Sequence, residues 1–210
     1  IQQHPQHNFI TQMNELKPLA THHDDMVLDM AYDFYGRYLA TASADQHVKV
    51  FQFNKDTSNW EPNDSWRAHD SSVIKVDFAH PQYGHLLLSA SYDRTLKIWE
   101  EKFDEPLNSN KRWIKLKTIA DAHGPLYDAC FLPSWLGLKI ASIGNDGILR
   151  IYESNDPSDL SNWFLIDELQ VLNTPVASHL QSDFNIQWCP SRFGVEKFIV
   201  SALDKAYIYY

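Results

Sequence analysis

Histidine, serine and aspartate recur in the chain at spacings that could support nucleophilic catalysis. The most complete set is His69, Ser89 and Asp93, the three residue types that form the catalytic triad of many hydrolases. An active site has no reason to recur along a chain, and the Gly-x-Ser-x-Gly turn of the common hydrolases is absent from the sequence. The sequence therefore predicts a structural network and no enzyme. Related sets occur twice more: His23, Thr41 and Asp45, and His123, Ser142 and Asp146.

An aromatic residue lies six positions after each of these aspartates, and it completes a possible hydrogen-bond network. Trp99 supplies an indole N–H that Ser89 could accept, while the Ser89 hydroxyl bridges to His69 and Asp93 accepts from His69. Buried polar groups are stable when each has such a partner. The other repeats carry weaker versions of the network. Phe51 lacks a donor in the first, Tyr152 supplies a phenol in the third, and Val200 replaces the hydroxyl in the fourth.

The aspartates mark a long internal repeat. Asp45, Asp93, Asp146 and Asp204 are 48, 53 and 58 residues apart, and a glycine lies nine or ten residues before each. Alternating apolar residues follow each aspartate and also precede each glycine, a pattern typical of strands joined by turns. The polar segments 102–111 and 154–161 are predicted to be loop insertions that lengthen the repeats beyond about 45 residues.

A fourth strand completes each unit, and we expect it at 60–67, 113–119 and 164–171. Four short antiparallel strands per repeat, with the histidine-to-tryptophan spacing above, indicate the blades of a WD-repeat β-propeller. The predicted fold is all-β, with about four blades present. Residues 1–20 are expected to form a flexible tail, and residues 21–210 the propeller segment. Its expected repeats are 21–67, 68–119, 120–171 and 172–210.

The composition excludes several classes of function. A net charge of −9 among 210 residues disfavours nucleic acid as a direct partner. The apolar stretches are far shorter than the roughly 20 residues of a membrane-spanning helix. Two widely separated cysteines form neither a disulfide framework nor a zinc spacing. No cofactor or metal site is expected, since the histidine- and aspartate-rich segments fit no standard ligand spacing: His4, His7, His22, His23, Asp24 and Asp25.

Several loop segments are more specific than the repeat itself. A generic propeller does not need them, and they resemble fungal members of the small WD-repeat nucleoporins of the Y-shaped outer-ring complex of the nuclear pore, the Sec-thirteen-like family. The resemblance extends from about His23 to the end of the chain. The segments are 32–37 (Tyr-Asp-Phe-Tyr-Gly-Arg), 56–61 (Asp-Thr-Ser-Asn-Trp-Glu), 64–72 (Asp-Ser-Trp-Arg-Ala-His-Asp-Ser-Ser), 137–139 and 144–150.

The resemblance implies an open propeller of six blades that an α-solenoid nucleoporin closes by donating a seventh. It also implies two assemblies and no catalytic or cofactor residues. One assembly is the outer ring of the nuclear pore at the nuclear envelope, which serves nucleocytoplasmic transport and mRNA export. The other is a SEA-type complex at the periphery of the vacuolar membrane that regulates the target-of-rapamycin (TOR) kinase. The expected partners are therefore the α-solenoid donor and the other subunits of these two complexes.

The sequence departs from the family pattern because it carries only about four repeats and stops at Tyr210, on the third strand of a blade. A fragment of a longer propeller is one interpretation, and a closed four-bladed propeller with Leu16–Ala20 as its last strand is another. An alternative function is that of a WD-repeat substrate receptor or peptide-binding adaptor. Such adaptors often carry Trp-Asp-x-Arg after the third strand, whereas Trp99 is followed by Glu-Glu-Lys.

Overall fold

A computed structural model describes residues 18–156, 158–172, 184–191 and 193–210 of the chain. Fifteen strands in this part of the chain form four separate antiparallel sheets, three with four strands and the last with three. Within each sheet the strands follow chain order, each beside its sequence neighbour, as expected for short hairpin connections. The four sheets, here numbered one to four, are the blades that the repeats predict.

The strand bounds agree with the alternation in the sequence. The expected fourth strands at 60–67, 113–119 and 164–171 correspond to β4 (Asn59–Arg67), β8 (Trp113–Ile119) and β12 (Phe164–Gln170). The expected insertion 102–111 lies between strands, whereas the expected insertion 154–161 begins one residue early, because Ser154 still belongs to a strand. The bounds are as follows. Sheet one contains β1 (Val27–Tyr32), β2 (Tyr38–Ser43), β3 (His47–Asn54) and β4 (Asn59–Arg67). Sheet two contains β5 (Val73–Phe78), β6 (Leu86–Ser91), β7 (Leu96–Glu101) and β8 (Trp113–Ile119). Sheet three contains β9 (Leu126–Phe131), β10 (Leu138–Gly144), β11 (Ile148–Ser154) and β12 (Phe164–Gln170). Sheet four contains β13 (Phe184–Trp188), β14 (Phe198–Ala202) and β15 (Lys205–Tyr209).

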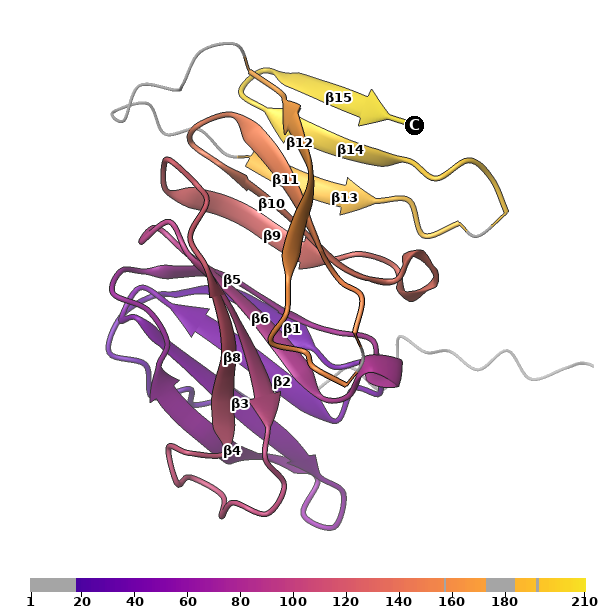
Figure 1. Ribbon diagram of the computed structural model, residues 1–210. Helices are drawn as coiled ribbons and strands as arrows, with labels where there is room; N and C mark the ends of the chain where they lie inside the picture. Colours follow the sequence, from indigo (N-terminus) through magenta and orange to yellow (C-terminus); the bar gives the residue numbers. More distant parts are fainter. Residues whose placement is uncertain (1–17, 157, 173–183, 192) are drawn as a thin grey trace, which may run out of the picture.

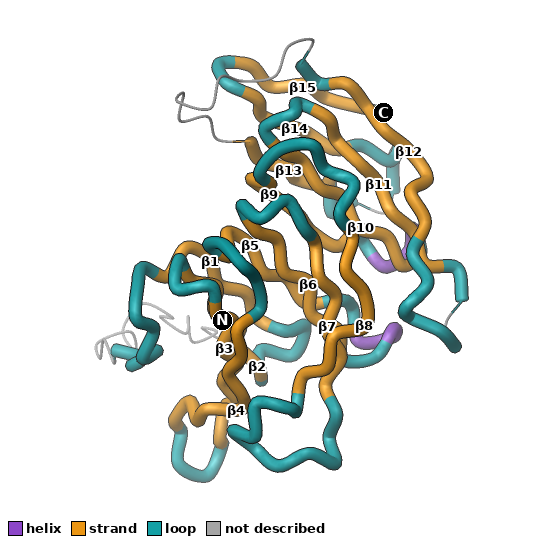
Figure 2. Tube along the Cα trace, turned by 60° about the vertical axis from the view of Figure 1, so that its left-hand side comes forward, coloured by secondary structure: helices purple, strands orange, loops and turns teal. Residues whose placement is uncertain are grey.

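The sheets stack face to face in chain order, with the first and last at opposite ends of the stack (Figure 1). Their first strands, β1, β5, β9 and β13, lie next to one another along one side, and Figure 2 shows the same succession from another direction. Three hydrophobic clusters fill the spaces between successive sheets. Each inner sheet therefore buries both faces, as a propeller blade must.

The two faces of a sheet are distinguished by the hydroxyl position of the repeat. We call the face that carries Thr41, Ser89, Ser142 or Val200 the network face, and the opposite face the back face. Leu87 and Trp99, on the network face of sheet two, pack against Ala40 and Val50 on the back face of sheet one. The same relation joins sheets two and three, and sheets three and four.

Residues 18–20 form no strand in the structure, and residues 16 and 17 lie outside the described part of the chain. The described residues therefore give no support to a four-bladed ring closed by Leu16–Ala20. Pro18, Leu19 and Ala20 instead line a small pocket with Phe51 and Trp60 on sheet one. Across the described ranges, no helix has the length and apolar character needed to cross a membrane.

Candidate functional site

The fullest hydrogen-bond network lies in sheet two. His69 precedes β5, Ser89 is on β6, Asp93 is in the β6–β7 hairpin and Trp99 is on β7. The Trp99 indole donates to Ser89 Oγ at 2.9 Å, and Ser89 Oγ lies 2.7 Å from His69 Nε2. His69 Nδ1 lies 2.9 Å from Asp93 Oδ2. Because a carboxylate only accepts, Nδ1 carries the proton and Nε2 accepts from the Ser89 hydroxyl. The indole, the hydroxyl and both ring nitrogens of this network therefore each have a partner.

The surroundings keep His69 neutral and Asp93 ionised. Burial lowers the pKa of His69, and the hydrogen bond and charge of Asp93 offset only part of this effect. Burial opposes ionisation of Asp93, but hydrogen bonds from His69 and Thr95 outweigh it and hold the pKa of Asp93 well below its usual range. The network is thus a neutral imidazole between a hydroxyl and a carboxylate.

The hairpin aspartate makes the same two backbone hydrogen bonds in sheets one, two and three. Oδ1 accepts the backbone N–H two residues later, which is an Asx turn, and Oδ2 accepts a backbone N–H from the segment that leads into the sheet. The backbone N–H groups that donate to Oδ1 of Asp45, Asp93 and Asp146 belong to His47 at 2.9 Å, Thr95 at 3.0 Å and Ile148 at 3.2 Å, respectively. The Oδ2 donors are Asp24 at 3.0 Å, Asp70 at 3.1 Å and His123 at 3.1 Å.

Sheet one has the same network without the last donor. His23 Nδ1 lies 2.8 Å from Asp45 Oδ2, and His23 Nε2 lies 2.9 Å from Thr41 Oγ1. Phe51 is buried at the tryptophan position and has no polar atom to contribute. The single proton of the Thr41 hydroxyl goes to His23 Nε2 or to the Lys49 carbonyl, which is 3.3 Å away, so this network ends at Thr41.

Sheet three differs from the expected set of His123, Ser142, Asp146 and Tyr152. The His123 side chain is 81% exposed, and its Nδ1 is 3.9 Å from Asp146 Oδ2. Arg150 takes the histidine's place: its side chain is 1% exposed and donates to Asp146 Oδ2 at 2.7 Å. Ser142 and Tyr152 are buried, but Arg150 rather than His123 binds Asp146. The guanidinium also pairs with Glu168 at 2.8 Å, and its Nη2 lies 3.3 Å from His123 Nδ1.

Sheet four has no hydroxyl at the position of Ser89, as the sequence predicts. Val200 is fully buried at the hydroxyl position, so the network face there is apolar. Asp204 is exposed in the β14–β15 turn. At the positions equivalent to Ser89 and Trp99 this sheet has Val200 and Tyr210, so the hydrogen bonds of sheet two have no counterpart there.

These networks cannot act as a hydrolase site. Ser89 has 0% of its surface exposed, and its hydroxyl is engaged by both His69 and Trp99. A substrate carbonyl could not come within the roughly 3 Å that attack requires. Within the described residues, no three histidine, cysteine or acidic side chains gather to hold a metal ion. His4 and His7 lie outside these residues.

A second buried network, which the repeat pattern does not predict, joins sheets one and two. Glu101, at the end of β7, accepts from Arg112 Nε at 2.6 Å and from Asn63 Nδ2 at 3.0 Å. Asn63, on β4, accepts from the Trp113 indole at 3.0 Å. His85 Nδ1 also bonds Glu101. The insertion that precedes Arg112 is therefore more than a surface loop, because it brings an arginine between two sheets.

The network face of sheet one is open on the β1 side. Val27, Met30 and Tyr32 are 36%, 63% and 60% exposed. Their counterparts by strand register, Val73, Val76 and Phe78 of sheet two, are 0%, 1% and 8% exposed because sheet one covers them. In the described part of the chain the first sheet packs against sheet two alone. Exposed apolar surface of this kind on a sheet marks a site for another chain or another sheet.

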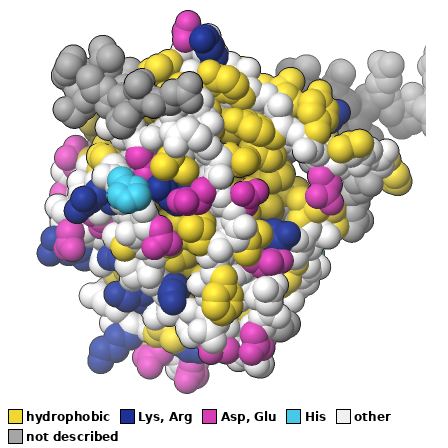
Figure 3. Space-filling model, turned by 45° about the horizontal axis from the view of Figure 1, so that its top comes forward, with side chains coloured by type: hydrophobic (Ala, Val, Ile, Leu, Met, Phe, Trp, Pro, Cys, Tyr) yellow, Lys and Arg dark blue, Asp and Glu magenta, His cyan; other side chains and the backbone are white. Residues whose placement is uncertain are grey.

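The opposite end of the stack is also partly apolar. Ile199 and Ile208 on the back face of sheet four are exposed. Hydrophobic side chains form a strip across this side of the molecule, with acidic and basic side chains on either side (Figure 3). Both ends of the stack thus present apolar sheet surface.

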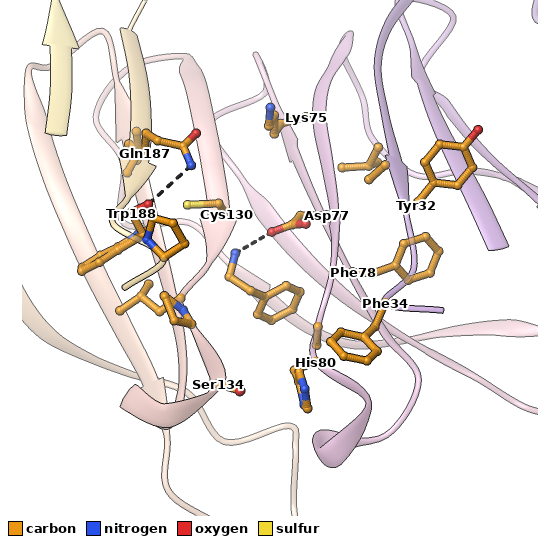
Figure 4. A pocket seen from close by; sticks show the side chains of 18 of the residues that line it. Tyr32, Phe34, Lys75, Asp77, Phe78, His80, Cys130, Ser134, Gln187 and Trp188 are labelled. Atoms are coloured by element: carbon orange, nitrogen blue, oxygen red, sulfur yellow. Dashed lines mark hydrogen bonds between the residues drawn. The ribbon is translucent and has the colours of Figure 1, made fainter. Parts of the chain in front are cut away.

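The first strands of the sheets border a cavity of about 560 Å³. Lys75 and Asp77 of β5, Cys130 of β9 and Gln187 of β13 point into it (Figure 4). Burial raises the pKa of Asp77 to about 7. Burial opposes the charge on Lys75, but the Asp128 and Asp29 carboxylates outweigh it and raise the lysine's pKa.

Comparison with known proteins identifies the repeat and its relatives. The family described as WD domain, G-beta repeat matches residues 14–52 and 60–100. Nucleoporin SEH1 of Saccharomyces cerevisiae is 57% identical over 194 residues, which is 92% of this chain and 56% of the relative. Nucleoporin seh1 of Schizosaccharomyces pombe is 39% identical over 191 residues, 91% of this chain and 56% of the relative. Human Nucleoporin SEH1 is 38% identical over 156 residues, 73% and 43% respectively.

The chain spans about half the length of these curated relatives. Their names describe nucleoporins and no enzyme, in agreement with a buried, repeated network that has no access to substrate. The all-β stack of four sheets is the fold that the WD repeats predict. The chain belongs to the WD-repeat proteins, with a β-propeller fold, and it is a relative of the Seh1 nucleoporins.

Proposed function

We propose that this chain is part of a scaffold subunit of the nuclear pore outer ring, which holds other proteins and catalyses no reaction. The observation that carries the proposal is the open network face of sheet one, where Met30 and Tyr32 are exposed at positions that sheet two buries. The identity of the relatives as nucleoporins supports the assignment to the pore.

The partner that fits this face is a β-sheet. Three times within the described part of the chain, the network face of one sheet is covered by the back face of the sheet before it. A partner that supplied one more sheet would cover Val27, Met30 and Tyr32 in the same way. We propose that an α-solenoid nucleoporin donates this blade, as the family resemblance implies, and that the chain contacts the other Y-complex subunits through it.

The resemblance also implies a wider cellular role. We propose that the protein supports nucleocytoplasmic transport and mRNA export at the nuclear envelope. We further propose that it serves a SEA-type complex at the vacuolar membrane that regulates TOR signalling. Both roles need the same scaffold property, which is a rigid stack of sheets with an open end.

Co-purification of the tagged full-length protein from its source cells tests the proposal. The wild type should recover an α-solenoid nucleoporin in equal amount, together with other outer-ring subunits. Met30→Glu should lose the solenoid because it places a charge on the surface to be buried. Leu107→Glu, at an exposed loop position away from this face, should retain it. Recovery of a cullin-type ligase, or of no stable partner, would refute the scaffold role.

A further inference from the structure

An aspartate carboxylate captures the backbone N–H at one fixed position on the inner strand of three sheets. The position is the residue paired with the hydroxyl site: Val76 with Ser89, Ala129 with Ser142 and Ile186 with Val200. Its N–H points away from the neighbouring strand, because N–H groups alternate in direction along an antiparallel strand. The acceptors are Asp29 for Val76 at 3.0 Å, Asp128 for Ala129 at 2.9 Å and Asp128 for Ile186 at 2.6 Å.

In two of the three cases the acceptor comes from the preceding sheet. Asp29 of β1 reaches Val76 of β5, and Asp128 of β9 reaches Ile186 of β13. Asp29 and Asp128 occupy equivalent register positions, each one residue before the residue paired with the hydroxyl site. These two carboxylates therefore join sheet one to sheet two and sheet three to sheet four along the inner side of the stack.

The third case, in which Ala129 is bound by Asp128 of its own strand, follows from the residue that sheet two has at this position. Lys75 stands at the position of Asp29 and Asp128, and an ammonium group cannot accept a hydrogen bond. Asp128 therefore binds the N–H of its own neighbour, Ala129. Lys75 Nζ instead lies 3.6 Å from Asp29 and 3.7 Å from Asp128. Asp77, two residues later, reaches Phe131 N of the next sheet at 2.8 Å and restores the link between sheets (Figure 4).

Met30 is the fourth member of this set. It pairs with Thr41, the hydroxyl site of sheet one, so its N–H also points to the inner side of the stack. The Asp29 carboxylate accepts from the Val76 N–H and lies 3.6 Å from Lys75 Nζ, and among the described residues it accepts no hydrogen bond from Met30. In the described part of the chain, no sheet precedes β1 to supply an acceptor.

We propose that the sheet that covers β1 belongs to a partner chain and carries an acidic residue on its innermost strand, whose carboxylate accepts the Met30 N–H. This proposal rests on the proposed function and adds a chemical requirement to it. An apolar sheet alone would cover Met30 and Tyr32, but the repeated pattern asks for a carboxylate at one register position. That carboxylate would fix the depth and register at which the partner's blade enters.

Residue-resolved amide hydrogen exchange of the full-length protein, free and in complex with the co-purified solenoid, tests this inference. The Met30 amide should exchange at least tenfold more slowly in the complex. Each acidic residue of the donated blade is then changed singly to Ala and to Asn. One Ala variant should restore fast exchange at Met30 while native mass spectrometry still finds the complex, and the matching Asn variant, which keeps an acceptor, should retain protection.

The Val76 amide is the internal control, because Asp29 of the chain itself captures it, and its exchange should not respond to changes in the partner. Asp29→Ala should speed exchange at Val76. Unchanged exchange at Met30 in a complex that forms would overturn the carboxylate while leaving the scaffold role intact. Protection of Met30 in the free protein would also overturn it, since another sheet of the same chain would then cover β1. Failure to form any complex would refute the proposed function itself.

Discussion

Arg150 occupies the place beside Asp146 that His69 occupies beside Asp93. The guanidinium donates to Asp146 Oδ2 at 2.7 Å, and the His69 imidazole lies 2.9 Å from Asp93 Oδ2. Arg150 sits on the strand that follows the hairpin, four residues after its aspartate, whereas His69 comes from the segment before the sheet. Two different side chains, which approach from different segments, thus bind the equivalent hairpin carboxylate in sheets three and two.

The position of Arg150 predicts that two residues of sheet three differ widely in their contribution to the free energy of unfolding. Arg150→Ala leaves the buried Asp146 carboxylate without its cationic partner and should lower the free energy of unfolding by roughly 3 kcal/mol. His123→Ala removes a solvent-exposed ring whose Nδ1 lies 3.3 Å from Arg150 Nη2, and it should change the free energy of unfolding by less than about 0.5 kcal/mol. Urea denaturation of both variants measures the difference. A large loss of stability for His123→Ala with a small loss for Arg150→Ala would show that His123, and not Arg150, is the partner that stabilises Asp146.

Asp93→Ala should destabilise the protein by about 1–3 kcal/mol, because it removes the carboxylate that accepts from the buried His69 Nδ1 and leaves only the Thr95 hydroxyl, 3.1 Å away, in its place. It also removes the acceptor of the Thr95 and Asp70 N–H groups. Asp104→Ala, at an exposed loop position, is the matched control and should lie within about 0.5 kcal/mol of wild type. Thermal and chemical denaturation report both. Equal free energies of unfolding for the two variants would show that Asp93 does not stabilise the fold.

The neutral imidazoles predict a loss of stability in mild acid. Burial lowers the pKa of His69 below the usual 6.5, and it does the same for His23. The unfolded chain therefore binds protons at these residues first, so stability is complete above pH 6.5 and falls as the pH drops below it. Nitrogen-15 NMR should show His69 neutral and protonated on Nδ1 at pH 7. An imidazolium, or the Nε2-protonated form, would contradict the network.

The raised pKa of Asp77 predicts the opposite pH dependence, because its contribution to stability falls as the pH rises. Burial raises its pKa from 3.8 to about 7, against Lys75 and the Phe131 N–H, which favour the charged form. Its contribution is complete below pH 3.8 and is lost as the pH rises to about 7. Asp77→Asn keeps an acceptor for Phe131, so its stability relative to wild type should increase between pH 4 and 7 and then level off. Asp104→Asn should show no such trend.

The sequence predicts features that depend on short spacings along the chain. The four-stranded unit and the set of His69, Ser89, Asp93 and Trp99 follow from such spacings, because one hairpin and its flanking strand place all four residues. Arg150 was missed because a charged residue in an alternating strand usually faces solvent. The bond of Asn63 with Glu101, and the capture of Val76 by Asp29, join different sheets. Their geometry depends on how the sheets stack, which local patterns do not encode.

The central claim is that the network face of sheet one receives a blade from a partner, and site-specific photo-crosslinking tests it most directly. A benzophenone amino acid is placed at position 30 of the full-length protein in its source cells, and at position 107 as the control. We predict a crosslink from position 30 to an α-solenoid nucleoporin, within its sheet-forming segment, and none from position 107. A crosslink from position 30 only to this protein's own chain, or none to a nucleoporin, would contradict the claim.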